Sequence, residues 1–418
     1  MKRIGHITTA PASKRTSARL RLAAVLFFIF SASLYSQSFT SFIAALEKAP
    51  MAQRVTIADR YIAKLKSTPL IEKDSLLHFI FYGAADMVMV NGNLQHWNEP
   101  DTLNRIDCGA HAFFYRSYVV PPDARLDYLF IVNGRTILDP WNFRTTPSGF
   151  GPHSEVQMPK FVSSPYLVRN DSVQQGRMDS VVLFKYLNPP LSRYSLSGRA
   201  VKVYLPPGYD SLSLLPVLYV HDGYEAIDFA RLPTVIDNLI AAHRIVPIIA
   251  VFIPPSQRRD EYVFEQRDKF VSILSDELVP MIDRKYRTDP QPKKRGMIGI
   301  SSGGHISLYT VLKRPDIFGN VGGQSSTITP WLAELVQRQS GKNALSPSMK
   351  IYIDCGRYDI RPTEPIYGTV DFLESNREFS TLLSSLRIPH FYKEVNDGHE
   401  WASWRERMPE MLMFFFAK

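Results

Sequence analysis

The sequence is poor in cysteine, which argues against two kinds of protein. Only Cys108 and Cys355 occur among the 418 residues. That number excludes a scaffold held together by several disulfides, and it makes a structural zinc site unfavourable. We expect the two thiols to be buried separately in different domains. The alternative is that they pair in an oxidising compartment.

Acidic residues and a long hydrophobic run are both lacking near the N-terminus. Residues 1–36 hold six basic residues and no acidic one, so the rest of the chain has 43 basic against 40 acidic residues, or +3 instead of +9. The apolar run 22–30 is well short of the roughly 20 residues that span a bilayer. This pattern predicts a secretory signal peptide, with an uncleaved anchor as the alternative. We expect an exported protein, periplasmic or extracellular, that meets the membrane only through this segment and binds no nucleic acid.

The chain after residue 36 is rich enough in apolar residues, 45% of the whole, to bury two cores. Residues 37–70 have apolar side chains at three- and four-residue spacing, which predicts a helical leader broken near Pro50. Residues 71–160 hold alternating, aromatic segments with turns between them and no helix, and they predict a small immunoglobulin-like β-sandwich. Its expected strands cover 76–83, 86–92, 111–120 and 127–134.

The hydrophobic pattern changes again after a polar linker over 161–184. Between 185 and 418, short apolar runs alternate with helical segments such as 269–286, which is typical of strands buried on both faces of a sheet. We therefore predict an α/β domain with the doubly wound, mostly parallel sheet of the α/β-hydrolase fold. Its expected strands cover 200–207, 214–223, 246–255, 296–304, 349–356 and 390–395.

The strongest local signal for chemistry is Gly299-Ile300-Ser301-Ser302-Gly303-Gly304. It follows an expected strand and precedes an expected helix, which is the context that a nucleophile elbow requires. Its glycines permit a sharp turn that presents the serine hydroxyl above the sheet, near a helix N-terminus. Ser301 is therefore the candidate nucleophile.

A serine nucleophile needs a base, and in this fold the order along the chain is serine, acid, histidine. His399 is the candidate base because it lies in a turn-rich stretch beyond the last expected strand. His305 follows the elbow too closely, and His390 begins a strand. Asp359 is the candidate acid because it lies in a loop at the carboxyl end of a strand, where active sites of open α/β sheets collect. Asp354, inside that strand, and a serine–histidine pair without an acid are the alternatives.

The developing oxyanion of acyl transfer needs backbone donors. One is the amide of Ser302, and the other is the amide of Gly223 or Tyr224 in the loop after an earlier strand. The alternative for 221–223 is a plain turn. All these groups belong to the protein, so the chemistry needs no metal ion and no organic cofactor.

These residues resemble the Putative esterase family of α/β-hydrolases, and within it the enterochelin (ferric siderophore) esterases. The resemblance covers most of residues 185–418. Its matching stretches are 204–209, 220–223, 259–262, the elbow, 314–318, 324–326, 398–401 and 404–405. The expected sandwich is similar to the early-set N-terminal domain of those esterases at 91–97 and 139–143.

The resemblance implies a ferric catecholate trilactone as substrate, opened by ester hydrolysis so that iron is released. Three arginines are candidates to bind its acidic groups: Arg258, Arg259 and Arg357. The alternative for each is a surface or ion-pair role.

Two further hypotheses remain. The same fold serves feruloyl and acetyl esterases of plant polysaccharides, for which Trp97, Trp141 or Trp401 would hold the sugar or phenol unless these rings belong to the core. The third is a glycan-binding protein whose hydrolase half is inactive. The expected partner is thus a small-molecule or glycan-linked ester, and no oligomeric state is predicted.

Overall fold

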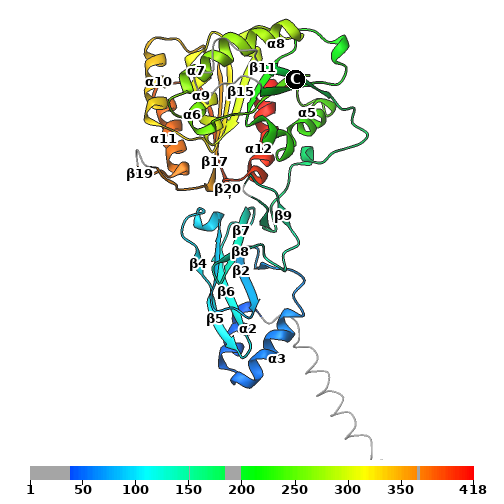
Figure 1. The fold of residues 1–418 in the computed structure, drawn as a ribbon, viewed down its shortest axis with the longest axis vertical. Coiled ribbons are helices and arrows are strands. Elements are labelled where there is room, and N and C mark those ends of the chain that lie inside the picture. Colours follow the sequence, from blue (N-terminus) through cyan, green and yellow to red (C-terminus); the bar gives the residue numbers. More distant parts are fainter. Residues whose placement is uncertain (1–37, 150, 184–198, 365–367) are drawn as a thin grey trace, which may run out of the picture.

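The computed structural model describes residues 38–149, 151–183, 199–364 and 368–418, and the expected signal peptide lies outside them. The described chain has two parts stacked along its long axis (Figure 1). One part has two antiparallel sheets and is called the two-sheet region below. The other is built on one sheet of eight strands and is called the large-sheet region. Within the described ranges, no helix is both long and apolar enough to cross a membrane.

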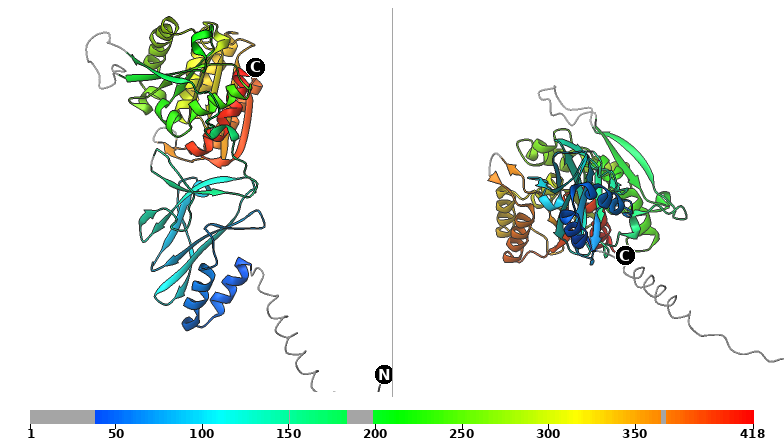
Figure 2. Two further views of the ribbon diagram at one scale, coloured as in Figure 1. Left: turned by 90° about the vertical axis from the view of Figure 1, so that its right-hand side faces the viewer. Right: turned by 90° about the horizontal axis from the view of Figure 1, so that it is seen from below.

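The two-sheet region begins with two helices, α2 (Phe39–Lys48) and α3 (Met51–Ile62), separated at Pro50 as the apolar spacing predicts. Phe42 of α2 packs against Phe113 on the outer face of the four-stranded sheet, in a small core of its own. Figures 1 and 2 show both helices at the end that lies farthest from the large-sheet region. The helical leader is therefore part of this region and does not cover the large sheet.

Two antiparallel sheets follow these helices. One has the strand order β1-β2-β6-β5, and the other has the order β4-β3-β7-β10-β9 with β8 beside β7. Apolar side chains from both sheets, including Phe79, Phe114 and Phe130, share one buried core. Strand β3 alternates between buried and half-buried residues, as its sequence predicts, whereas β2 and β6 also bury Ile80 and Phe113 beneath the leader helices. The strands are β1 (Leu70–Glu72), β2 (Leu76–Gly83), β3 (Val88–Gly92), β4 (Asp101–Thr102), β5 (Asn104–Cys108), β6 (His111–Val119), β7 (Arg125–Val132), β8 (Arg135–Ile137), β9 (Thr145–Thr146) and β10 (His153–Gln157).

The large-sheet region has the strand order β11-β12-β14-β13-β15-β16-β17-β20. The pairs β11–β12 and β12–β14 are antiparallel, and the remaining pairs are parallel. The carboxyl ends of β17 and β20 lie next to the two-sheet region (Figure 1). The strands are β11 (Arg177–Leu183), β12 (Arg199–Leu205), β13 (Val217–His221), β14 (Ile249–Ile253), β15 (Arg295–Ile300), β16 (Asn320–Gln324), β17 (Lys350–Tyr358) and β20 (Phe391–Gly398).

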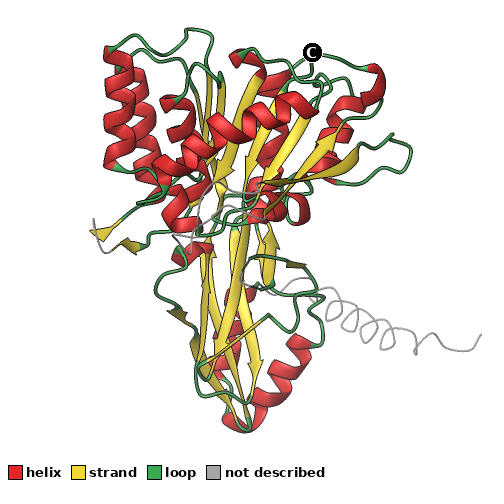
Figure 3. Cartoon of the chain, turned by 45° about the horizontal axis from the view of Figure 1, so that its top comes forward, coloured by secondary structure: helices red, strands yellow, loops and turns green. Residues whose placement is uncertain are grey.

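Helices cover both faces of this sheet (Figure 3). Helices α5 and α12 bury residues such as Ile236 and Leu412 against one face, whereas α7 to α11 bury residues such as Phe270 and Leu308 against the other. A π-helical turn joins α7 to α8, so the helix expected over 269–286 is nearly continuous. The helices are α4 (Gly223–Asp228), α5 (Leu232–Ala241), α6 (Arg258–Tyr262), α7 (Arg267–Ile273), α8 (Val279–Lys285), α9 (Ser302–Lys313), α10 (Pro330–Gly341), α11 (Phe372–Ser385) and α12 (Trp401–Phe416).

The linker expected over 161–184 needs correction, because its second half is a strand. Strand β11 pairs with β12 along its whole length, from Arg177 opposite Leu205 to Leu183 opposite Arg199. Its sequence RMDSVVL mixes polar and apolar residues, as an edge strand with one solvated side does. The sheet therefore begins about eight residues before the predicted domain boundary at 185.

Both cysteines are buried and neither is in a disulfide. Cys108 lies in the small core beneath the leader helices, and Cys355 lies in β17. The prediction of two separate thiols is confirmed.

Candidate active site

The serine elbow has the backbone geometry that its sequence predicts. Ser301 lies between β15 and α9 with φ 54° and ψ −123°, a strained conformation for a residue with a side chain. A Cβ on Gly299 would come within 2.2 Å of the Gly303 carbonyl oxygen, so the sharp turn depends on glycine there. The neighbouring strand holds the strained residue: the Ser301 amide donates to the Gln324 carbonyl at 2.9 Å, and the Thr327 amide donates to the Ser301 carbonyl at 3.0 Å.

The histidine and the acid meet at the edge of the same sheet. His399 follows β20, Asp359 follows β17, and the Nδ1 of His399 lies 2.5 Å from the Oδ1 of Asp359. Burial alone would raise the pKa of Asp359, but the charge of His399, its hydrogen bond and the Ile360 amide outweigh burial and lower it. Asp359 is therefore ionised at neutral pH. In the neutral imidazole, the Nδ1–H faces this carboxylate, and Nε2 is left as a proton acceptor.

Aromatic rings fix the orientation of the His399 imidazole. Trp404 of α12 and Phe372 of α11 each meet it edge-on, with ring centroids 4.8 Å and 5.1 Å away. The indole nitrogen of Trp404 in turn donates to the Ser325 hydroxyl at 3.0 Å. The ring is thus held from both sides by helices that pack on different faces of the sheet.

The alternative acids and bases have other partners. His305 is buried in α9 between the Tyr262 carbonyl and the Thr329 hydroxyl, and burial lowers its pKa to about 3. His390 lies 2.8 Å from the Ser380 hydroxyl. Asp354 is fully buried in β17, where it accepts from Gln324 at 3.0 Å and lies 3.3 Å from Arg407. Of the histidines and aspartates considered, the structure brings His399 and Asp359 together.

The oxyanion candidates lie at two adjacent helix N-termini. Ser302 is the first residue of α9, and Gly223 and Tyr224 are the first two of α4; their strands β15 and β13 are parallel neighbours. Amides in the first turn of a helix have no acceptor within that helix, so they remain able to bind an anion. A Cβ on Gly223 would lie 2.4 Å from the backbone of β14, which explains the glycine.

Arg258 ties these two loops together. Its guanidinium makes two hydrogen bonds of 2.7 Å to the buried carboxylate of Asp222 and a third of 3.3 Å to the Ile300 carbonyl. Asp222 has φ 51° and immediately precedes Gly223. Arg258 is expected above to bind acidic substrate groups, but its guanidinium is paired with Asp222 beside the candidate oxyanion loop.

The other expected substrate-binding residues lie in three different settings. Arg357 lies near the end of β17, its side chain is 55% exposed, and its Nε lies 3.5 Å from Glu394. Arg259 lies over the ring of Phe264, 4.9 Å from its centroid. Trp401 does not offer the expected platform, because it is 8% exposed and packs against Trp404 in the core. Its large apolar ring is buried, as such rings often are.

The two other tryptophans belong to the two-sheet region. The ring of Trp97 packs against that of His153 at a tilt of 36°, with centroids 4.6 Å apart, and Trp141 is half-buried with its backbone amide donating to Asp139. Neither is an exposed ring beside Ser301.

Sequence reasoning missed a set of residues from the two-sheet region. The Nδ1 of His96 lies 2.6 Å from the backbone carbonyl oxygen of Asp359. The side chain of Asn93 packs closely on Gly398: a Cβ on Gly398 would lie 2.1 Å from the Asn93 amide nitrogen. Both belong to the turn after β3, within the stretch 91–97 that marks the resemblance. The stretch 91–97 could be recognised in the sequence. Its contact with the loops of Asp359 and Gly398, more than 260 residues away, follows only from the fold.

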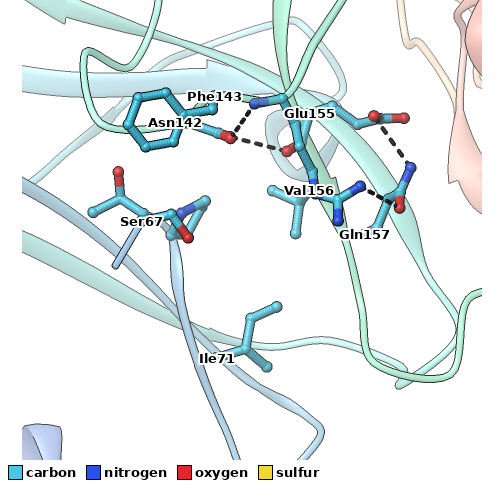
Figure 4. A pocket seen from close by; sticks show the side chains of 10 residues that line it. Ser67, Ile71, Asn142, Phe143, Glu155, Val156 and Gln157 are labelled. Atoms are coloured by element: carbon cyan, nitrogen blue, oxygen red, sulfur yellow. Dashed lines mark hydrogen bonds between the residues drawn. The ribbon is translucent and has the colours of Figure 1, made fainter. Parts of the chain in front are cut away.

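A pocket of about 200 Å³ lies elsewhere in the two-sheet region (Figure 4). Phe143, 84% exposed, stands on its rim. The polar groups around it are paired with one another, as Arg144 donates to Gln157 at 2.9 Å and Gln157 donates to Glu155 at 3.2 Å. The pocket lies apart from the candidate active site.

The strand order, the strained serine after β15 and the acid and histidine loops after β17 and β20 define an α/β-hydrolase-like fold. Comparison with known proteins agrees with this. The family described as "Putative esterase" matches residues 196–415, more than half of the chain. The chain therefore belongs to this family and is an ester-hydrolysing enzyme.

Relatives and solved structures extend the comparison. The uncharacterized protein YjcH of Bacillus subtilis is 29% identical over 211 residues, which are 49% of this chain and 85% of that protein. An endo-1,4-beta-xylanase/feruloyl esterase of Xylanibacter ruminicola is 26% identical over 283 residues, 63% of this chain and 34% of that protein. The crystal structure of ferric enterobactin esterase from Salmonella typhimurium has a TM-score of 0.65 at 18% identity, covering 85% of this chain and 98% of that one. The large-sheet region makes up less than 85% of the chain, so the likeness in fold also includes part of the two-sheet region.

Proposed function

We propose that the protein is a serine carboxylic ester hydrolase with Ser301 as nucleophile, His399 as general base and Asp359 as the acid that orients it. The observation that carries the proposal is the 2.5 Å bond between His399 and the buried Asp359, at the sheet edge that also bears the strained Ser301. A buried, ionised acid on Nδ1 holds the imidazole in the tautomer that accepts a proton at Nε2.

The reaction follows from these groups. The Ser301 hydroxyl oxygen attacks the ester carbonyl carbon while its proton passes to Nε2 of His399. The oxyanion that forms receives hydrogen bonds from the amide of Ser302 and from that of Gly223 or Tyr224. The carbon–oxygen bond to the alcohol then breaks, and the alcohol leaves with the proton from His399. Water attacks the acyl-enzyme by the same steps, releases the carboxylic acid and restores the serine.

We assign a siderophore-type ester, of the enterobactin kind, as the first substrate class. Support comes from the fold shared with enterobactin esterases over 85% of this chain. Arg357 and Arg259 would supply positive charge for catecholate groups, since Arg357 is exposed at the end of β17, two residues before Asp359. Iron would enter as part of the substrate.

The second candidate is a feruloyl or acetyl ester on a polysaccharide. The relative from Xylanibacter ruminicola, whose name includes feruloyl esterase, favours it. The proposed export of the chain, through a signal peptide at 1–36, and an early-set, immunoglobulin-like character of the two-sheet region agree with such a substrate. N-terminal sequencing of the exported protein tests this part, and a start after Ser33 or Ser36 is expected.

Covalent labelling with a fluorophosphonate tests the mechanism. The Ser301 oxygen displaces fluoride from phosphorus, His399 takes the serine proton, and intact mass and peptide mapping should place one phosphonyl group on Ser301. Ser301→Ala should remain unlabelled, whereas the matched change at the exposed Ser213 should label normally. Labelling on another serine would refute the assignment.

Comparison of three substrates separates the candidates. The mature protein should hydrolyse p-nitrophenyl acetate, and kcat/KM should be higher for a ferric catecholate trilactone than for methyl ferulate. The opposite order supports the polysaccharide esterase, and no hydrolysis of any substrate supports the glycan-binding hypothesis.

A further inference from the structure

Three side chains that could bind a metal ion meet where the two regions touch. Asp127 comes from β7, His153 begins β10, and Glu400 lies between β20 and α12. The Nδ1 of His153 lies 3.6 Å from Oδ2 of Asp127 and 3.8 Å from Oε1 of Glu400. All three ligand atoms lie within 4.8 Å of one another, and all three residues are buried. The sequence does not predict this group, because its members are far apart along the chain.

Two of these atoms are buried without a hydrogen-bond partner among the described residues: Oδ2 of Asp127 and Nδ1 of His153. The opposite end of each side chain is held in place. Arg125 donates to Oδ1 of Asp127 at 2.6 Å, and the Ser148 hydroxyl lies 3.5 Å from Nε2 of His153. Outer partners of this kind orient metal ligands. An unpaired carboxylate oxygen and an unpaired imidazole nitrogen thus face the same enclosed space.

The charges around this space do not balance. Arg125 is the cation within hydrogen-bond distance, and it is shared between Asp127 and Glu155, each at 2.6 Å. Glu400 adds a third carboxylate, so these groups sum to −2 with His153 neutral. Uncompensated charge is costly in a buried place, and a divalent cation would neutralise it.

Direct pairing among the three side chains does not satisfy their polar atoms. The Nδ1 of His153 lies more than 3.5 Å from either carboxylate, too far for a good hydrogen bond.

We propose that Asp127, His153 and Glu400 bind one divalent transition-metal ion of the Zn²⁺ or Mn²⁺ type. Two carboxylate oxygens and one imidazole nitrogen are a donor set for such ions and not for Mg²⁺ or Ca²⁺, which prefer oxygen alone. Zinc ligands at about 2.1 Å are roughly 3.4 Å apart, so side-chain shifts of less than about 1 Å close the site. The ion joins the two regions directly behind His399 and does not depend on the assignment of Ser301.

Metal analysis of the untagged mature protein tests the site. Protein purified without chelator should carry about one ion per chain. After dialysis against a chelator, it should take up Zn²⁺ or Mn²⁺ in a calorimetric titration at one site, and the melting temperature should rise on loading because only the folded chain holds the site. Ca²⁺ should produce neither effect.

Three variants make the test specific. His153→Ala and Glu400→Gln should bind the ion at least tenfold more weakly and lose the rise in melting temperature. Glu400→Gln keeps the size of the side chain, so it tests the site even if His153→Ala fails to fold. His111→Ala, at an exposed histidine of β6, should bind like the parent protein. The proposal is wrong if the parent protein binds neither ion at one equivalent, or if both ligand variants bind as tightly as the parent.

Discussion

The two regions contribute to the candidate site in different ways. The large-sheet region carries the serine, the acid and the histidine at the ends of three strands of one sheet. The two-sheet region carries none of them, yet His96 contacts the acid loop at the Asp359 carbonyl and Asn93 packs on Gly398 beside the histidine. Arg125 adds a bond of 3.1 Å to the Ser403 hydroxyl in the first turn of α12.

The serine elbow differs from the other two loops. The Ser301 backbone is hydrogen-bonded to Gln324, Thr327 and His305, and the Ile300 carbonyl accepts from Arg258; all these partners belong to the large-sheet region. The position of the proposed nucleophile is therefore determined by the large-sheet region alone, whereas the proposed acid and base are held by both regions. The difference implies that changes in the two-sheet region act on proton transfer and leave the elbow intact.

The largest effect should come from the acid of the large-sheet region. Asp359→Asn should reduce kcat about 10³- to 10⁴-fold, because an amide at this position favours the wrong imidazole tautomer. Hydrolysis of p-nitrophenyl acetate measures it, and Asp171→Asn at an exposed aspartate is the matched control. A loss of less than tenfold would mean that Asp359 is not the orienting acid.

The next effect should come from the arginine that joins the two oxyanion loops. Arg258→Ala removes both bonds to Asp222 and lets the Gly223 loop move, and a displacement of about 1 Å can lower kcat roughly 10²-fold. Arg258→Lys should recover little, since an ammonium cannot replace the bidentate fork. If KM rises while kcat is unchanged, Arg258 binds substrate and does not hold the loop.

A smaller effect should come from the two-sheet region. His96→Ala removes one hydrogen bond to the acid loop, and we expect kcat to fall about tenfold, equivalent to about 1.4 kcal/mol, with KM little changed. Steady-state kinetics beside His111→Ala measures it. Unchanged kcat in His96→Ala would mean that the two-sheet region has no part in positioning the acid.

The smallest effect on catalysis should come from the buried tryptophan of the large-sheet region. Trp401→Phe should leave KM for a feruloyl ester unchanged and lower the free energy of unfolding by about 1 kcal/mol, since a smaller ring replaces a larger one in the core. Denaturant unfolding and KM are both needed. A KM increase of tenfold or more without loss of stability would restore the aromatic-platform hypothesis.

Much of the large-sheet region could be predicted because the residues that determine each strand, helix and turn are close together in the sequence. Apolar strands alternate with helices there, and the elbow glycines specify a turn that the structure reproduces with Ser301 at φ 54°. The proximity of Asp359 to His399 could be predicted because the topology places these strand ends at one edge of the sheet. Strand β11 was missed because one polar edge strand lacks the apolar run that the buried strands have.

Contacts between the regions could not be predicted in this way. His96 and Asn93 are ordinary turn residues in the sequence, and only the packing of one region on the other brings them to Asp359 and Gly398. Trp401 was misjudged for a related reason. An aromatic residue next to a candidate base is equally compatible with a platform and with a core, and burial decides between them.

The identity of the nucleophile is the central claim, and hydrolysis of p-nitrophenyl acetate by Ser301→Ala tests it most directly. The account predicts a loss of about 10³-fold or more in kcat, with a melting temperature close to that of the parent protein. Full activity in a folded Ser301→Ala protein would contradict the account, because the strained serine of the elbow after β15 would then not be the nucleophile.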